Sequence, residues 1–259
     1  MKIVVLVKHV PDTAGERRLT PDGVLDRAGS DGRLCELDEY AAEQALRLAD
    51  EQPGTKITYL TMGPADATDS LRKALAMGGD EAVHVCDGRL ASADFLTTSL
   101  VLATAVQAIG ADLVLAGMAS TDGAGGVLPA MLAQRIGAAQ VTLAAQLEVA
   151  DGVIKARRDD ERGSMLLSAP LPAVVSVTDR SGEPRYPTFK GVLAAKKKPV
   201  HTWTLDELGL DAASEPALLP STQVLTVTER PARQAGTVVV DQGGAAAQLA
   251  DFLATRRLV

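Results

Sequence analysis

A loop of small residues is the part of this chain best suited to bind an anion. The apolar run at residues 113–116 predicts a buried strand, which ends at Gly117. The sequence Ser-Thr-Asp-Gly-Ala-Gly-Gly follows at residues 120–126, and an alanine-rich helical pattern resumes at Val127. Backbone N–H groups in such a loop can converge on an anion, and the helix N-terminus adds about half a positive charge. The pattern fits a phosphate site and a plain solvent-exposed turn equally well.

Residues that could carry acid–base or metal chemistry are sparse. Cys35 and Cys86 lie far apart, without the spacing of zinc ligands or of a disulfide framework. His9 follows the first predicted strand and could face a ligand, although a solvent-facing position is the simpler interpretation. His84 alternates with valines, which is typical of a strand residue whose ring is hydrogen-bonded within the fold. The carboxylates at residues 159–161 lie between arginines, which is typical of a solvated loop. We expect no catalytic residue and no metal site. The scarcity of acid–base and metal-binding side chains favours a binding or carrier role.

The composition is that of a globular chain without affinity for nucleic acid. The chain has 259 residues, enough for one large or two modest domains, and 46% of them are hydrophobic. A net charge of −7 argues against non-specific binding to nucleic acid. No apolar run approaches the roughly 20 residues that span a bilayer, and two cysteines without a partner suit a reducing compartment. We therefore expect a cytoplasmic protein that is not embedded in a membrane.

Strand and helix patterns alternate over the first two thirds of the chain. Predicted strands lie at residues 2–7, 57–61, 83–86 and 113–116, with predicted helices at 38–50, 66–77 and 93–109. In the last of these helices Phe95, Leu102, Val106 and Ile109 are expected to face inward. The alternation predicts parallel βαβα winding, and hence an α/β sheet flanked by helices.

The pattern changes after Val141. An Asp151-Gly152 turn predicts a hairpin, and two further strands follow it. The predicted segments are strands at residues 141–149, 153–157, 165–168 and 173–178, loops at 11–32 and 180–199, irregular chain at 204–237, and a helix at 245–258.

Two features of the second half are typical of a partner surface. Phe189 lies among Pro, Lys and Gly, in a segment without the apolar periodicity of a helix or strand that packs on the core. It therefore either anchors a partner or packs beneath its own loop. The basic run at residues 196–198 could steer an acidic partner, because the chain as a whole is negative. The tail from about Leu210 is hard to place on the predicted core, so it either reaches another subunit or forms a surface extension.

Short motifs along nearly the whole chain form a specific series. They are VLVKHVPDT at residues 5–13, DEYAAEQA at 38–45, GPA at 63–65, RKALAMG at 72–78, STDG at 120–123, LPAVVS at 171–176, EPRY at 183–186, AAKKK at 194–198 and AG at 235–236. Each is weak alone, but their order and spacing together resemble the beta subunit of electron-transfer flavoprotein, of the AMP-binding, actinobacterial-like type.

The resemblance implies an electron carrier that forms a heterodimer with a larger alpha subunit. FAD would be held mainly by the alpha subunit near the subunit junction, and AMP would bind to this chain as a structural nucleotide. Carried over by position, the nucleotide contacts would come from the ends of predicted strands and from the small-residue loop. They are Leu6, Lys8, Cys35, Glu36, Leu37, Asp38, Met62, Ala119, Ser120, Thr121, Asp122, Gly123, Ala124, Gly125, Gly126, Val127, Leu128, Pro129 and Ala130.

The resemblance also implies a docking loop at residues 183–199 for partner dehydrogenases. The residues that it assigns to docking are Tyr186, Phe189, Lys190, Lys196, Lys197 and Lys198. Electrons would pass from acyl-CoA and related flavin dehydrogenases, as in fatty acid beta-oxidation, through FAD to a membrane quinone oxidoreductase. Because the cofactor carries the chemistry, no catalytic residue of this chain is required.

The expected fold is therefore α/β, a Rossmann-like parallel-core sheet flanked by helices, with a partner-docking loop and an extended C-terminal arm. Residues 1–209 would form the nucleotide-binding domain, and residues 210–259 an arm and helix that reach the alpha subunit. Three alternatives stay open: a bifurcating type with a second FAD in this subunit, a free-standing adenine-nucleotide-binding protein, and a hydrolase or ligase acting on an adenine nucleotide. For the last of these, only Asp122 offers a carboxylate in the small-residue loop.

Overall fold

The computed structural model describes residues 1–16, 18–211, 215–228 and 230–259. It divides the chain into two compact units, unit 1 at Met1–Val224 and unit 2 at Leu225–Val259. Residues 17, 212–214 and 229, which belong to the predicted loop at 11–32 and to the predicted C-terminal arm, lie outside the described residues.

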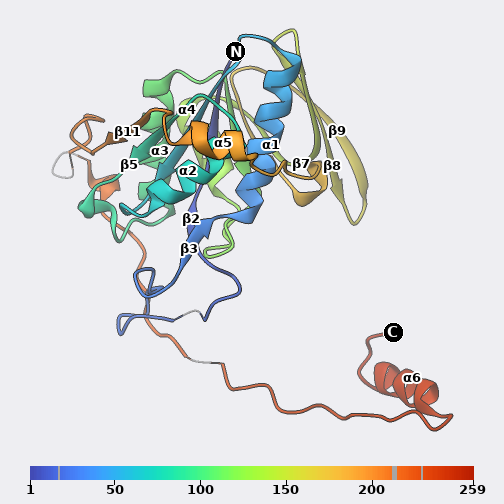
Figure 1. Ribbon diagram of the computed structural model, residues 1–259. Helices are drawn as coiled ribbons and strands as arrows, with labels where there is room; N and C mark the ends of the chain where they lie inside the picture. The colour runs from blue at the N-terminus through green and yellow to red at the C-terminus, as the bar shows by residue number, and fades with distance from the viewer. Residues whose placement is uncertain (17, 212–214, 229) are drawn as a thin grey trace. The chain divides into compact units, whose positions relative to one another are not determined.

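Within the described residues, unit 1 is built on a nine-stranded sheet of order β11-β5-β4-β1-β6-β10-β7-β8-β9 (Figure 1). The strands are β1 (Lys2–Leu6), β4 (Lys56–Met62), β5 (Glu81–Val85), β6 (Leu113–Gly117), β7 (Ala139–Ala150), β8 (Val153–Asp160), β9 (Gly163–Pro170), β10 (Ala173–Val177) and β11 (Val200–Trp203). All neighbours from β11 to β7 pair in parallel, whereas β7, β8 and β9 pair antiparallel. The predicted α/β fold is confirmed.

Strand β1 has the next two parallel strands of the chain, β4 and β5, on one side and β6 and β10 on the other. The strand order therefore reverses between β1 and β6. In open α/β sheets, ligands bind outside the carboxyl ends of the strands at such a switch point.

Helices cover both faces of the sheet (Figure 1). They are α1 (Glu36–Glu51), α2 (Ala67–Met77), α3 (Phe95–Ile109), α4 (Leu128–Ile136) and α5 (Phe189–Ala195). Alternate residues of β1 divide between two cores, as the period of a strand dictates. Ile3 and Val5 pack with α1 and α2, while Val4 and Leu6 pack with α3 and α4. Burial on both faces explains the continuous apolar sequence of this strand.

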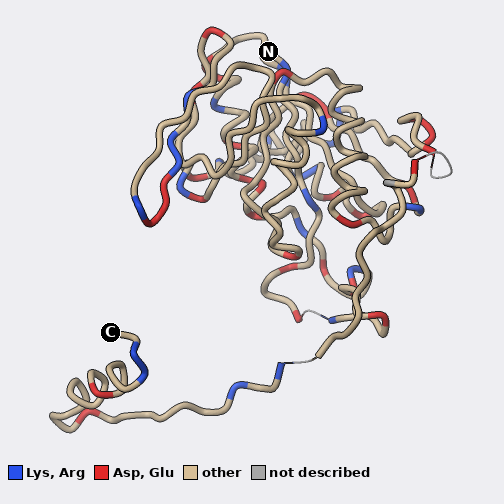
Figure 2. Tube along the Cα trace, turned by 180° about the vertical axis from the view of Figure 1, so that it is seen from behind, with Lys and Arg blue, Asp and Glu red and all other residues tan. Residues whose placement is uncertain are grey.

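The predicted hairpin around Asp151-Gly152 is confirmed as β7 and β8, and β9 extends it. Charged residues of both signs gather along β8 and its turn into β9 (Figure 2). Asp159 pairs with Arg157 Nε at 3.1 Å and accepts a hydrogen bond from Ser164 Oγ at 2.7 Å. The acidic residues at 159–161 therefore lie in a strand end and a turn rather than in a loop.

Three short strands and one short α-helix were not predicted. Strands β2 (His9–Pro11) and β3 (Gly32–Leu34) pair across the long polar segment, and β11 adds an edge strand beside β5. The segment at 180–199 was predicted to be a loop, but it contains α5. These elements have three, four or seven residues, which is too short for a periodic pattern to show.

The inward position predicted for Phe95 is wrong, because its side chain is 46% exposed. Phe95 is the first residue of α3, just after the capping residue Asp94. Helical side chains tilt toward the N-terminus, so a residue in the first turn extends beyond the core that the later turns pack against.

Unit 2 contains the predicted C-terminal helix, α6 (Ala245–Thr255). This helix buries none of its residues, and both Leu249 and Phe252 are at least half exposed. Among the described residues of the whole chain, no helix is long and apolar enough to cross a membrane.

Candidate functional site

A cavity of about 650 Å³ opens at the carboxyl edge of the sheet. Its walls come from the ends of β1, β4, β5 and β6, which include both strands at the switch point. The cavity therefore lies where a parallel α/β sheet places its ligand, and its volume is typical of small-molecule sites, roughly 300–1,000 Å³. Its middle is apolar, with Leu60, Met62 and Leu102 in the lining.

Gly117 brings α1 close to the end of β6. A Cβ atom at this position would lie 2.6 Å from Asp38 Oδ1 and 2.7 Å from the carbonyl oxygen of Leu37. Asp38 is buried in the first turn of α1, and its Oδ2 accepts a hydrogen bond of 2.8 Å from the backbone N–H of Lys8. Burial raises the pKa of Asp38 to about 7. One carboxyl group thus ties the ends of β1 and β6 to α1.

A buried carboxylate holds two cations at one end of the cavity. Asp122 Oδ1 lies 3.0 Å from Lys8 Nζ, and Asp122 Oδ2 pairs with the guanidinium of Arg27. The Asp122 side chain is only 2% exposed. Burial alone would raise its pKa, but the hydrogen bonds from Ser120 and Arg27 and the charge of Lys8 outweigh burial and hold the pKa below its usual range. Asp122 is therefore ionised, and both cations line the cavity.

The small-residue loop turns tightly between β6 and α4. The Ala124 N–H donates to the Ser120 carbonyl oxygen at 2.9 Å, and Ala124 and Gly126 have positive φ angles of 49° and 64°. At Gly125 an added Cβ would lie 2.2 Å from Phe95 Cζ, so only glycine lets the ring lie over the loop. Gly125, Gly126 and the first residues of α4 line the cavity, which brings a helix N-terminus to the end that holds the two cations.

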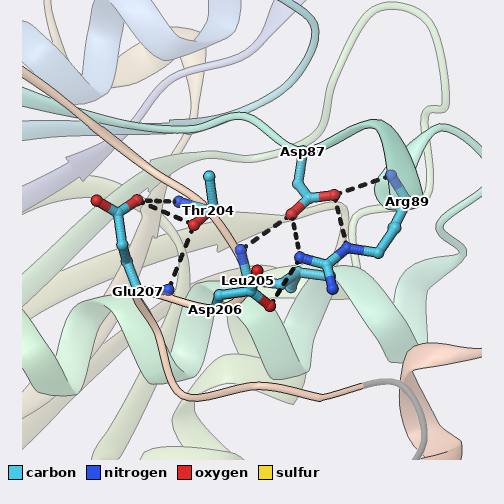
Figure 3. Close-up of polar contacts among 6 residues, drawn as sticks. All are labelled: Asp87, Arg89, Thr204, Leu205, Asp206 and Glu207. Atoms are coloured by element: carbon cyan, nitrogen blue, oxygen red, sulfur yellow. Dashed lines mark hydrogen bonds and ion pairs between the residues drawn. The ribbon is translucent and has the colours of Figure 1, made fainter.

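The opposite end is formed by the turn after β5 and is fixed by charged contacts. Asp87 accepts hydrogen bonds from Arg89 Nε at 2.9 Å and from the Leu205 N–H at 3.2 Å, and Arg89 also reaches Asp206 Oδ1 at 3.0 Å (Figure 3). The Arg89 hydrogen bonds hold the pKa of Asp87 below its usual range. The chain after β11 is thereby attached to the wall of the cavity.

Asp94 attaches a second point of the same segment. Its Oδ1 caps α3 by accepting from the Thr97 N–H at 3.0 Å, and its Oδ2 accepts from Ser221 N–H at 2.8 Å and Ser221 Oγ at 2.9 Å. Asp94 and Thr222 both line the cavity. Sequence reasoning missed this wall, although an Asp directly before a helical pattern is a signal for a helix cap.

The structure brings about half of the predicted nucleotide contacts into the lining of this cavity. They are Leu6, Lys8, Asp38, Met62, Ala119, Ser120, Gly125, Gly126, Leu128 and Pro129. The others lie in the same segments without lining it: Cys35, Glu36, Leu37, Thr121, Asp122, Gly123, Ala124, Val127 and Ala130. Burial raises the pKa of the Cys35 thiol to about 11, which leaves it protonated at neutral pH.

Two histidines near the cavity have different surroundings. His9, expected to face solvent, is half-buried, lines the cavity and lies 2.8 Å from Ser70 Oγ through its Nδ1. His84 is buried in β5 and contacts Thr68 Oγ1 and the Gly63 carbonyl oxygen, as predicted for a satisfied strand residue.

The predicted docking residues surround α5. Tyr186 is 93% and Phe189 81% exposed, so the alternative in which Phe189 packs beneath its own loop does not hold. Lys190, Lys196 and Lys197 are also exposed. Lys198 instead donates to the carbonyl oxygens of Leu75 and Gly78 at the end of α2, at 2.8 and 3.2 Å.

The underside of α5 is fixed to α2. Arg72 donates to the carbonyl oxygens of Ala195 and Lys198 at 2.6 and 2.8 Å. A Cβ at Gly191 would lie 2.4 Å from the Ala76 carbonyl oxygen, so the two helices approach closely only because this residue is glycine. The exposed Phe189 is thus carried on a firmly packed helix, and Tyr186 lies three residues before it.

Fold and site together define a mostly parallel α/β protein with a crevice at its switch point, lined by two cationic side chains. The family model for the electron transfer flavoprotein domain matches residues 22–208. The electron transfer flavoprotein subunit beta of Mycobacterium leprae (strain TN) is 42% identical over 99% of both chains. That of Mycobacterium tuberculosis (strain ATCC 25618 / H37Rv) is 41% identical, also over 99% of both. The caffeyl-CoA reductase-Etf complex subunit CarD of Acetobacterium woodii is 33% identical over 92% of each chain.

This chain belongs to the electron transfer flavoprotein family. It aligns with beta subunits from end to end, which implies an alpha subunit as its partner. Members of the family are electron transfer flavoproteins.

Proposed function

We propose that the cavity at the switch point holds AMP as a structural nucleotide, in a heterodimer whose FAD is held mainly by the alpha subunit. The observation that carries this proposal is the uneven distribution of charge in the cavity. Lys8, Arg27 and the small-residue loop at 120–126 form one end, and apolar side chains line the middle. A phosphate suits the cationic end, and an adenine ring suits the apolar middle. FAD, when bound, supplies the electron transfer.

The proposed donors are acyl-CoA dehydrogenases and other flavin dehydrogenases in the cytoplasm, and the proposed acceptor is a membrane quinone oxidoreductase. This assignment would place the carrier in fatty acid beta-oxidation. The exposed ring of Phe189, beside Tyr186 and the lysines at 190, 196 and 197, supports docking at α5. Exposed aromatic side chains on a rigid support are typical anchors of transient complexes.

We further propose that residues 210–259 form the arm that reaches the alpha subunit. Leu249 and Phe252 of α6 are exposed within their own unit, and a partner would remove their apolar surface from water. Residues 1–209 would then be the nucleotide-binding domain, with Ser221 and Thr222 of the arm attached to the wall of its cavity.

A second FAD in place of AMP is the competing candidate, because the lining of the cavity is largely apolar and suits a flavin ring as well as adenine. Co-expression with the alpha subunit, followed by denaturing release and chromatography of the bound nucleotides, separates the two. One FAD and one AMP per heterodimer would support the proposal. Two FAD without AMP would establish the competing candidate, and a homodimer without flavin would contradict both.

A further inference from the structure

Arg27 reaches the cavity from a part of the chain that the sequence did not connect with it. The residue lies in the polar segment between β2 and β3, 95 positions before Asp122. Its guanidinium pairs with Asp122 and lines the cavity beside Lys8. The segment between β2 and β3 therefore contributes a charged side chain to the site.

Both cations keep hydrogen-bond donors for a ligand. Lys8 Nζ has three N–H groups, of which Ser120 Oγ at 3.5 Å and Asp122 Oδ1 at 3.0 Å take two. Arg27 has five N–H donors in a planar fork that matches a phosphate. Their side chains are 42% and 40% exposed, respectively, so both heads remain accessible from the cavity.

The rest of the lining offers no comparable cationic group. Among the described residues that line the cavity, Lys8 and Arg27 are the only lysine and arginine. The carboxylates of Asp87 and Asp94 lie in the lining contributed by the β5 turn and α3, and they are already engaged by Arg89, Leu205, Thr97 and Ser221. Asp122 contacts both cations and balances one of their two positive charges, and Asp38, whose pKa is about 7, is the other carboxyl group beside Lys8.

We propose that Lys8 and Arg27 form a two-cation clamp for a phosphate group, with Arg27 as a ligand-binding residue and Asp122 as a positioning residue behind both. This inference rests on the proposed nucleotide pocket and adds a binding residue from the segment between β2 and β3. The phosphate belongs to AMP or to the pyrophosphate of FAD, which offer the same chemistry to the clamp.

The test is titration calorimetry on the nucleotide-depleted heterodimer, with AMP, FAD and adenosine as titrants. Arg27→Ala is expected to weaken AMP binding about tenfold or more and to leave adenosine within about twofold, because only AMP presents a phosphate to the lost donors. Arg27→Lys keeps the positive charge but lacks the planar fork of donors. Its affinity for AMP should therefore lie between those of the wild type and of Arg27→Ala. Arg18→Ala removes an exposed arginine of the same segment that pairs with Glu16, and it should leave every affinity unchanged.

The positioning role of Asp122 is tested by a double-mutant cycle. If Asp122 orients Arg27, the Arg27→Ala loss measured in an Asp122→Asn background will be smaller than in the wild type. If the losses of AMP affinity from the two substitutions are fully additive, the positioning role of Asp122 is overturned.

The outcomes separate the clamp from the pocket itself. The clamp would be overturned if both Arg27 variants lost affinity for AMP and adenosine equally, or if neither variant lost affinity. Binding of AMP by the wild type would still uphold the pocket in that case. A wild type that binds neither AMP nor FAD at this subunit would overturn the proposed nucleotide function. If FAD rather than AMP binds the wild type tightly, the same tenfold weakening by Arg27→Ala is expected with FAD.

Discussion

The cavity and the α5 surface are built by opposite means. At the cavity the carboxylates are buried and paired: Asp38 accepts from the Lys8 N–H just after β1, and Asp122 holds Lys8 and Arg27. At α5 the polar contacts lie underneath, in the bonds of Arg72 and Lys198 to backbone carbonyls, while the aromatic rings above have no cover.

The difference indicates two kinds of recognition. Buried paired charges give a site of fixed geometry, which suits a nucleotide that stays bound. An exposed ring on a rigid helix offers apolar area with little loss of conformational entropy, which suits partners that come and go. Substitutions in the first region should therefore change stability and ligand retention, and those in the second should change only encounters with partners.

The largest effect is expected for Gly117→Ala. The added Cβ would meet the carbonyl oxygen of Leu37, which is backbone and cannot move aside, so the variant should lose about 3 kcal/mol of unfolding free energy. Urea denaturation measures this loss. Gly88→Ala is the matched control, because nothing lies within 4 Å of its added Cβ. Equal stability of the two variants would contradict the close approach of α1 to β6.

The next effect is a pH dependence centred on Asp38. Its pKa is raised to about 7, above the ordinary 3.8, so the folded chain holds this proton more tightly than the unfolded chain. Its contribution to stability is therefore full below pH 4 and is lost as the pH rises toward 7. Between pH 5 and pH 8, the wild type should lose about 1–3 kcal/mol relative to Asp38→Asn, which does not titrate. Urea denaturation measures the unfolding free energy of both proteins across this pH range. Parallel dependence of the two free energies on pH would contradict this assignment.

A smaller effect, confined to partner encounters, is expected for Phe189→Ala. Loss of an exposed anchor should reduce electron transfer from a dehydrogenase about tenfold, while nucleotide content and stability stay unchanged. Steady-state kinetics with an acyl-CoA dehydrogenase measures the rate. Leu166→Ala serves as control, since Leu166 is 84% exposed on β9, away from α5. Equal rates for both variants would remove α5 from the docking surface.

The sequence predicted the parallel core and its switch-point edge, because buried strands and amphipathic helices leave strong periodic patterns. The small-residue loop was also evident, because glycines between a strand and a helix are typical of a backbone that turns tightly beside a ligand. Arg27 was not predictable, because the polar segment that carries it has no period and its ion pair joins residues far apart in the chain. Phe95 was placed wrongly since helical periodicity does not reveal where the core ends.

The central claim, that the loop at 120–126 faces a nucleotide phosphate, is tested most directly by the AMP content of purified heterodimers carrying Gly125→Asp or Gly125→Asn. Both variants push against the Phe95 ring alike, but only the aspartate brings a negative charge to the cationic end of the cavity. We expect about one AMP per wild-type heterodimer, a modest loss with asparagine, and at least about tenfold less AMP with aspartate. Equal AMP content in the two variants would contradict the claim.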